Sequence, residues 1–317
     1  MGQVGWEARG TARAERRMRE SVVPGRGLVA HAGPEARVMG QAGPVRSLIP
    51  RAAVAGLAIV AAAVTMTAPG QAAAGAVNGS SAGRSPAGTL PLAGRVVALD
   101  PGHQLGNGRF PDQIDDPVWV GFWKPCNTTG TATSGGFPEA TFAWRVAQRL
   151  RARLEAAGAT VRMTRTTNSN DDWGPCVDRR GRFGARVGAD LMVSLHGDGA
   201  APSTRGFFVI RPGWREGYTD DIARPSRRLA RDLRTGLLAA GFPVTRAYGG
   251  DGLDVRRDLG TLNMSDTPTA LVELGNMRNR TDARCMTSRT CRARYAGGVA
   301  RGVTAFLTGA AGVWMGS

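Results

Sequence analysis

The sequence predicts an α/β fold: a single domain in which a mostly parallel, twisted β-sheet carries helices on both faces. Three observations lead to this prediction. Short apolar runs typical of buried strands alternate with amphipathic helical segments. The chain after residue 76 is long enough for one good core, and neither an internal repeat nor a second shift in composition divides it.

The first 76 residues are predicted to be an N-terminal extension and a secretory signal peptide. Basic residues precede the apolar stretch AAVAGLAIVAAAVTMTAPG, and small residues follow it, as in secretory signals. Cleavage is expected after Ala74 or Ala76, and Met39 would give such a signal a start of ordinary length. The alternative is an uncleaved anchor, although the apolar stretch is short against the roughly 20 residues of a spanning helix.

The remaining chain divides by composition. Residues 77–94, rich in Gly, Ser, Pro and Ala, are predicted to form a flexible linker. Residues 95–310 are predicted to be the catalytic domain, and 311–317 a short tail.

The first half of the domain is predicted to form a strand, a long helix and a second strand. The apolar run at 96–99 indicates a buried strand. Pro138 suits the first turn of a helix, and Gly158 ends it. Its apolar stripe recurs at helical spacing through Phe142, Val146, Leu150 and Leu154. The alternation at 160–165 then predicts a strand.

The second half repeats this alternation. Apolar periodicity predicts helices and apolar runs predict strands. The expected helices are 178–187, 222–240 and 292–307, and the expected strands are 191–195, 206–210 and 269–274.

The charge balance is strongly basic. The chain has 41 Lys and Arg against 25 Asp and Glu, a formal net charge of +16, and Lys124 is its only lysine. A basic secreted domain suits an anionic partner such as a bacterial wall. No basic stripe interleaved with aromatic residues is present, so no nucleic-acid partner is expected. We expect a secreted, wall-associated monomer with no stable membrane insertion once the signal is cleaved.

Four cysteines follow the predicted signal: Cys126, Cys176, Cys285 and Cys291. An even number in a secreted protein favours disulfides, and three connectivities are possible. Pairing the near neighbours Cys285 and Cys291 would leave Cys126 with Cys176. The spacings do not match those of zinc-binding cysteine clusters.

Both histidines of the predicted domain lie where strands end. His103 follows the first strand in "RVVALDPGHQ", and His196 follows the strand at 191–195. Glu273 lies at the end of the strand 269–274, and Glu139 in the first turn of the long helix. In α/β sheets the ligand site lies outside the carboxyl ends of the strands.

These four side chains have the composition of a hydrolytic zinc site. Two imidazoles and one carboxylate leave a fourth position for water, and zinc lowers the pKa of that water to near neutral. A second carboxylate can transfer the proton to a leaving amine. The residues alone do not decide whether Glu139 or Glu273 is the ligand.

Four blocks of the sequence resemble the zinc-dependent N-acetylmuramoyl-L-alanine amidases of the amidase-3 family, over about residues 95–310. They are "ALDPGHQ", "PEATFAWRVAQRLRARLEAAGATVRMTR", "ADLMVSLHGDG" and "PTALVELGNMRN". The resemblance implies that His103, Glu139 and His196 bind Zn²⁺ and that Glu273 is the catalytic acid and base. It implies cleavage of the amide between N-acetylmuramic acid and the L-alanine of the stem peptide, in peptidoglycan or muropeptide fragments.

The resemblance to the small, secreted, single-domain members also implies a Cys126–Cys176 disulfide. No long helical insertion of the kind that blocks the site in other members is visible between Gly206 and Pro268, so an open, unregulated cleft is expected. The alternatives are a zinc carboxypeptidase or other amidohydrolase on the same scaffold, and an inactive wall-binding protein.

Other residues have less specific interpretations. Asp100 is expected to hold the turn before His103 or to support that histidine, and Asp198 to belong to a loop or to support the site. Arg179 and Arg180 are expected on a solvated helix or, alternatively, to bind a substrate carboxylate. The aromatic residues Trp119, Phe122 and Trp123 are expected to form a packed flap or the floor of a glycan groove.

Overall fold

The structure is a computed structural model that describes residues 90–309. The predicted extension, the signal peptide, residues 77–89 of the linker and the C-terminal tail lie outside the described residues. Within them, no helix combines the length and the apolar character needed to cross a membrane.

A six-stranded sheet forms the centre of the fold, with strand order β4-β1-β5-β8-β6-β7. The first four strands of this order are parallel, β6 runs antiparallel to β8, and β7 is parallel to β6. The mostly parallel α/β sheet is therefore confirmed. The strands are β1 (Val96–Pro101), β4 (Thr160–Met163), β5 (Leu191–Asp198), β6 (Phe208–Pro212), β7 (Leu253–Arg256) and β8 (Thr269–Asn276).

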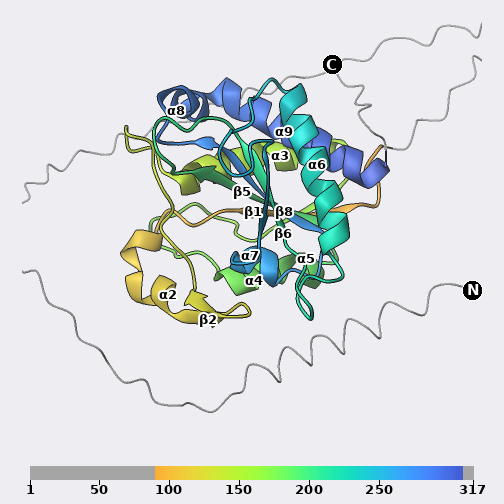
Figure 1. Cartoon of the computed structure of the whole chain (residues 1–317), viewed down its shortest axis with the longest axis horizontal. Helices are drawn as coiled ribbons and strands as arrows, with labels where there is room; N and C mark the ends of the chain where they lie inside the picture. Colours follow the sequence, from red (N-terminus) through yellow and green to blue (C-terminus); the bar gives the residue numbers. More distant parts are fainter. Residues whose placement is uncertain (1–89, 310–317) are drawn as a thin grey trace, which may run out of the picture. The chain divides into compact units, whose positions relative to one another are not determined.

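Three long helices cover one face of the sheet: α3 (Glu139–Ala156), α6 (Ala223–Ala239) and α9 (Arg289–Thr308) (Figure 1). Their apolar stripes pack on alternate strand residues such as Val97, Leu99 and Val193 in the largest apolar cluster. Because side chains alternate across a strand, Ala98, Asp100 and their neighbours in register face the other side.

Short elements cover that other face: α4 (Val177–Gly181), α5 (Phe183–Arg186) and α7 (Gly260–Asn263) (Figure 1). A hairpin of β2 (Pro117–Trp119) and β3 (Trp123–Pro125) packs beside α4. The remaining elements are η1 (Asn107–Arg109), α2 (Pro111–Asp115) and α8 (Arg280–Thr287). Because this cover is made of short pieces, it leaves room for a cleft.

The structure corrects two predicted elements. The helix expected over 178–187 is broken at Arg182 into α4 and α5, and the strand expected over 206–210 lies two residues later, at Phe208–Pro212. Gly206, at φ +98°, turns the chain before that strand, and a Cβ there would meet the backbone of Pro243. The turn therefore uses the first residues of the predicted run.

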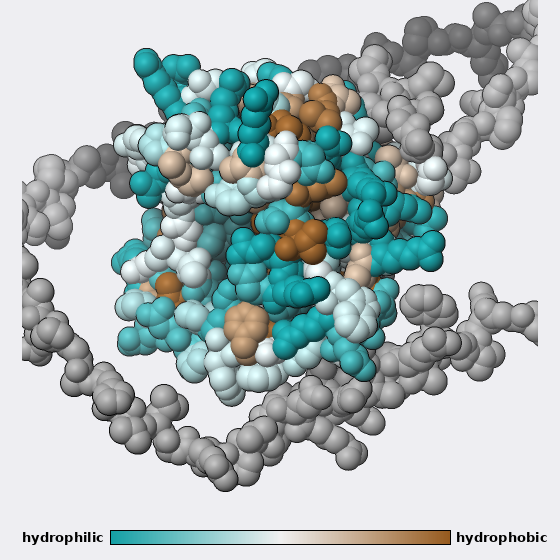
Figure 2. All heavy atoms as spheres, viewed as in Figure 1, coloured by the Kyte–Doolittle hydropathy of each residue, from teal (hydrophilic) through white to brown (hydrophobic). Residues whose placement is uncertain are grey.

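Two disulfides are present in the described chain: Cys126 pairs with Cys176 and Cys285 with Cys291. Leu92, in the predicted linker, is fully buried, and its N–H donates to the carbonyl of Ala157. Figure 2 shows that the viewed face is mostly hydrophilic, with apolar side chains in small separate groups.

Candidate metal centre

The face of the sheet under the short elements carries the polar site. Strand registry places Asp100 beside Ser194, and His196 beside Glu273. Residues two apart on a strand share a face, so these four side chains belong to the same side of the sheet. The opposite side is the apolar core, and the site is thus separated from it by a single layer of backbone.

His103, Glu139 and His196 come together at the carboxyl edge of this sheet. His103 Nε2 lies 3.2 Å and His196 Nδ1 2.8 Å from the same atom, Glu139 Oε1. The imidazole centroids are 4.9 Å apart, with the rings nearly perpendicular. Among the described residues these three make up the one group whose potential metal-ligand atoms converge, within 4.8 Å of one another.

The carboxylate of Glu139 is held by backbone donors from the end of β5 and from the loop before α3. Gly197 N donates to Oε1 at 3.1 Å, and Thr131 N donates to Oε2 at 2.9 Å. Burial opposes ionisation of this group, but the charges and hydrogen bonds of His103 and His196 outweigh burial and hold the pKa of Glu139 well below its usual value. Glu139 is therefore an ionised, oriented acceptor.

His103 occupies a strained turn directly after β1. Its φ of +56° is in the left-handed region, which non-glycine residues adopt rarely and at a cost of about 1–3 kcal/mol. The carbonyl of Thr128 lies 2.9 Å from Nδ1. If Nδ1–H donates to that carbonyl, the lone pair of Nε2 is free to bind a metal.

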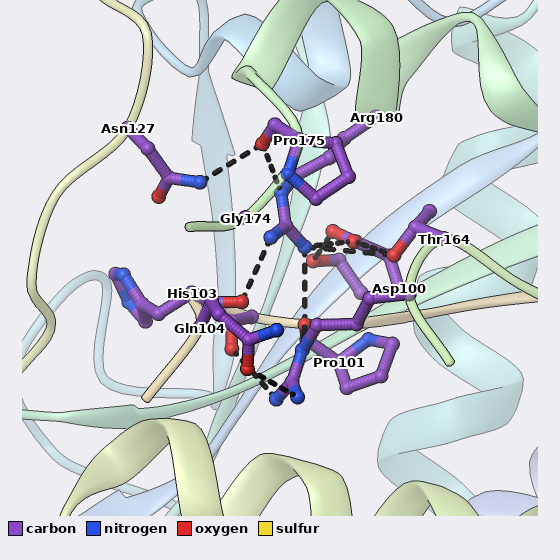
Figure 3. Close-up of polar contacts among 12 residues, drawn as sticks. Asp100, Pro101, His103, Gln104, Asn127, Thr164, Gly174, Pro175 and Arg180 are labelled. Atoms are coloured by element: carbon purple, nitrogen blue, oxygen red, sulfur yellow. Dashed lines mark hydrogen bonds and ion pairs between the residues drawn. The ribbon is translucent and has the colours of Figure 1, made fainter. Parts of the chain in front are cut away.

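A buried ion pair lies behind this turn (Figure 3). The guanidinium of Arg180 on α4 approaches the Asp100 carboxylate at 2.5 Å and donates to the carbonyls of Pro101 at 3.0 Å and His103 at 2.8 Å. Thr164 and Ser194 also donate to Asp100. Burial acts against ionisation, but Arg180 and these two hydroxyls outweigh it and lower the pKa of Asp100 to about 2.

The location of Arg180 differs from the sequence expectation. Its side chain is 2% exposed, so the expectation of a solvated position is wrong for this residue, whereas Arg179 is exposed. The same helix carries both residues, and helical periodicity turns one inward. Asp100 supports the His103 turn through Arg180, and we find no direct hydrogen bond between Asp100 and the His103 ring among the described contacts.

A second buried arginine ties β1 to α3. Arg165 donates to the carbonyl of Pro101 at 2.9 Å and to that of Ala140, in the first turn of α3, at 2.8 Å. Burial, together with the nearby charge of Arg180, lowers the pKa of Arg165 to about 9. This contact fixes the strand end that carries His103 relative to the helix start that carries Glu139.

Glu273 has an environment opposite to that of Glu139. It lies beside His196 in register, and its Oε2 atom is buried with no hydrogen-bond partner in the described part of the chain. Burial, then the negative charges of Glu139 and Asp198, raise the pKa of Glu273 well above its usual value. Two neighbouring carboxyls whose pKa values are pushed apart are typical of acid–base sites.

Asp198 is half-buried at the end of β5, and a register shift in the β5–β8 ladder separates it from His196. Burial raises its pKa. Asp198 therefore lies at the site, where its charge acts on Glu273, and does not belong to a loop away from the site.

These side chains line one cleft of about 400 Å³. The metal triad, Asp198 and Glu273 are at one part of its wall, and its other lining residues include Phe208, Ile210, Tyr248, Lys124 and Arg256. Tyr248 stacks on Phe208 with centroids 4.6 Å apart. The aromatic residues expected to form a packed flap or the floor of a glycan groove, Trp119, Phe122 and Trp123, belong to the β2–β3 hairpin and line no part of this cleft. Trp119 donates to Tyr218 Oη.

The donor set fits zinc. Ligands at 2.0–2.2 Å in a tetrahedron are about 3.3 Å apart, and the two imidazole nitrogens lie 3.2 and 2.8 Å from the carboxylate oxygen. The Glu273 Oε2 atom, which has no hydrogen-bond partner among the described residues, could accept a hydrogen bond from a fourth, non-protein ligand such as water.

The sequence model of the amidase-3 family, described as N-acetylmuramoyl-L-alanine amidase, matches residues 97–305. The chain belongs to the amidase-3 family. The match spans every residue of the site, from His103 to Glu273, and the family resemblance predicted from the four sequence blocks is confirmed.

Individual relatives agree with this membership. The chain is 40% identical over 230 residues to N-acetylmuramoyl-L-alanine amidase Rv3717 of Mycobacterium tuberculosis, covering 72% of this chain and 91% of the relative. The crystal structure of the N-acetylmuramyl-L-alanine amidase of Mycobacterium smegmatis is similar, with a TM-score of 0.64, 36% identity, and coverage of 69% of this chain and 99% of that one. The crystal structure of the apo form of the N-acetylmuramyl-L-alanine amidase of Mycobacterium abscessus is also similar. Its TM-score is 0.63 and its sequence identity 39%, with coverage of 68% of this chain and 99% of that one.

Proposed function

We propose that this amidase-3 protein is a secreted peptidoglycan hydrolase that uses zinc to cleave the amide between N-acetylmuramic acid and L-alanine of the stem peptide. Family membership supports the amide bond and the substrate class. The single observation that supports metal use is the convergence of two imidazoles on one ionised carboxylate, beside a second carboxyl with no partner.

The residues have separate tasks in this proposal. His103, Glu139 and His196 would hold the ion, which supplies a Lewis acid that lowers the pKa of water to near neutrality. Glu273 accepts the proton that water loses as its oxygen bonds to the carbonyl carbon. Glu273 then donates that proton to the alanine nitrogen as the C–N bond breaks. Such proton transfer contributes roughly 10²–10⁴-fold to the rate.

The environments of the two glutamates support this division. A ligand must be ionised, and the histidines lower the pKa of Glu139. A group that both takes and returns a proton needs a pKa nearer neutrality, and burial with two neighbouring carboxylates raises that of Glu273. Secretion is supported by the two disulfides, which persist in oxidising compartments.

The test is digestion of a defined muropeptide with the product masses measured. The expected products are the intact stem peptide with a free L-alanine amine and the muramic acid with a free lactyl carboxylate. Loss of a terminal amino acid would instead indicate a carboxypeptidase. A Glu273→Gln variant should keep one bound zinc by elemental analysis and lose nearly all activity.

Glu155→Gln is the matched control, because Glu155 lies on the surface of α3 and pairs only with Arg151 within the described contacts. A wild-type protein that retains full activity after exhaustive chelation, or that is as inert as Glu273→Gln, would contradict the zinc amidase proposal.

A further inference from the structure

The cleft extends from the metal triad across the open face of the sheet. Glu273 on β8 pairs with Phe208 on β6, and Pro212 of β6 pairs with Arg256 on β7. Strand geometry puts Arg256 roughly 13 Å along and roughly 10 Å across the sheet from Glu273. Apolar side chains of Phe208, Ile210 and Leu271 line the cleft between these ends.

Lys124, on β3, lies at the Arg256 end of this cleft. It is the only lysine in a chain with 41 lysines and arginines. Its Nζ donates to the backbone carbonyl of Asp258 at 3.3 Å. Lys124 is among the residues that line the cleft, and no ion pair within the described residues involves it.

The nearest acidic side chain is already occupied. Arg256 donates two hydrogen bonds to the carboxylate of Asp258, at 2.7 and 2.5 Å. Burial lowers the pKa of Lys124; the charge of Asp258 acts in the opposite direction, and the charge of Arg256 lowers the pKa by a smaller amount. An added anion beside Nζ would compensate this half-buried charge.

The two ends of the cleft thus have opposite charge. The triad end carries the carboxyls of Glu139, Asp198 and Glu273. The far end offers an unpaired ammonium. A peptide substrate that carries carboxylates has a lower energy with them directed away from the triad and toward Lys124.

We propose that Lys124 binds a carboxylate of the stem peptide beyond its first residue, and so orients the peptide along the cleft. The proposal rests on the amidase function proposed above and adds a substrate-recognition site to it. By the strand geometry above, Arg256 is roughly 16 Å from Glu273, and an extended peptide covers about 3.5 Å per residue, so a carboxylate on the side chain of the third residue reaches closer to Lys124 than one on the second.

The experiment compares three synthetic substrates in steady-state kinetics with zinc-loaded enzyme. The first is N-acetylmuramoyl-L-alanyl-D-glutamic acid diamide, whose peptide has no carboxylate. The second keeps the γ-amide and has a free α-carboxylate on the second residue. The third is the isoglutamine form extended by diaminopimelate, whose carboxylates belong to the third residue.

The wild type is expected to cleave one of the two carboxylated substrates with a kcat/KM about tenfold higher than that for the diamide. The difference should lie mainly in KM, because a hydrogen bond to a charged group strengthens substrate binding by about that factor. The favoured substrate identifies the residue. In Lys124→Met the ratio should fall to near one, and Lys124→Arg should restore most of it. Lys124→Gln is a second neutral variant should the methionine variant unfold.

Arg162→Met is the matched control, because it removes an exposed cation from β4, at the opposite edge of the sheet, and should keep the wild-type ratio. Equal kcat/KM for all three substrates in the wild type, or an unchanged ratio in both neutral variants, would overturn the role of Lys124 while leaving the amidase proposal intact. Failure of the wild type to release a peptide from any substrate would overturn both.

Discussion

The guanidinium of Arg180 and the carboxylate of Asp100 form an ion pair at 2.5 Å, and the same guanidinium donates to the backbone carbonyl of His103. Both side chains are almost completely buried. The pair connects the end of β1, the short helix α4 and the strained turn that presents a metal-ligand candidate. It links the stability of the sheet edge to the geometry of the site.

Replacing Arg180 should affect both stability and metal binding. Arg180→Met leaves the Asp100 carboxylate buried without its partner, which costs about 3–5 kcal/mol in the free energy of unfolding. It also removes the donor to His103, so zinc affinity should fall by about 10–100-fold. Urea denaturation and competition with a chromophoric chelator measure the two effects, and Arg179→Met, an exposed neighbour, should change neither.

The double variant Asp100→Leu/Arg180→Met separates these effects. Because it removes both charges, it should recover much of the lost stability. Zinc affinity should stay low, since the donor to His103 is still absent. Recovery of wild-type zinc affinity in the double variant would show that Arg180 does not position His103.

Acid should destabilise the protein through Asp100. The pKa of Asp100 is lowered to about 2 from 3.8, so its ionised form contributes to stability above about pH 4, and the contribution is lost as the pH falls toward 2. The shift corresponds to about 2 kcal/mol. Unfolding free energies measured between pH 5 and pH 2 should fall less steeply in Asp100→Asn than in the wild type; parallel curves would contradict this assignment.

Asp198 should set the acidic limb of the activity profile. Glu273 must be ionised to accept a proton, and after burial the neighbouring negative charges of Glu139 and Asp198 raise its pKa. Asp198→Asn removes one of them, so the limb of kcat/KM should move to lower pH. Asp112→Asn, an exposed substitution on α2, is the control. A limb that stays fixed in Asp198→Asn would argue against Glu273 as the base.

Gly102 should be intolerant of any side chain. A Cβ at this position would overlap the imidazole ring of His196, so Gly102→Ala must displace a proposed zinc ligand. Zinc affinity measured by chelator competition should fall by at least about tenfold. Gly108→Ala, whose added methyl would meet only Thr129 at 3.5 Å, should bind zinc as the wild type does.

The two disulfides should differ in their effect on stability. Cys126 and Cys176 are 50 residues apart, and Cys285 and Cys291 only 6. In the chain-entropy model the longer loop gives about 4 kcal/mol and the shorter about 2 kcal/mol. Urea denaturation of the two double-alanine variants tests this order. The first variant should also bind zinc more weakly, because Cys126 precedes the loop whose Thr128 contacts His103.

The sequence predicted the long helices and the central strands because their apolar residues pack in the hydrophobic core, which imposes a regular spacing on them. The stripe through Phe142 and Leu150 gave α3 almost to its ends. The edge strand β7, with the half-exposed sequence LDVR, has no apolar run and was not predicted. The antiparallel direction of β6 also has no local signal, since it depends on the connection from β5 over residues 199–207.

The candidate site was predictable in composition but not in the division of tasks. His103, His196 and Glu273 lie at strand ends, and sheet topology alone brings such residues to one edge. Which glutamate contacts the histidines depends on Thr131 in the loop before α3 and on Gly197 at the end of β5, whose backbone donors orient Glu139. Arg180 was missed because an arginine on a short helix with a polar sequence carries no sign that it is buried.

The reversal of β6 makes the two ends of the cleft independent parts. The proposed hydrolytic machinery consists of His103 after β1, His196 on β5, Glu273 on β8 and Glu139 at the start of α3, whereas Lys124 on β3 and Arg256 on β7 lie at the other end. Sequence changes in the turn between β2 and β3 and in the segment after β7 can therefore alter the Lys124 end without changing Thr128, which follows β3 and contacts His103. This separation makes the protein a suitable scaffold for grafting new wall specificities.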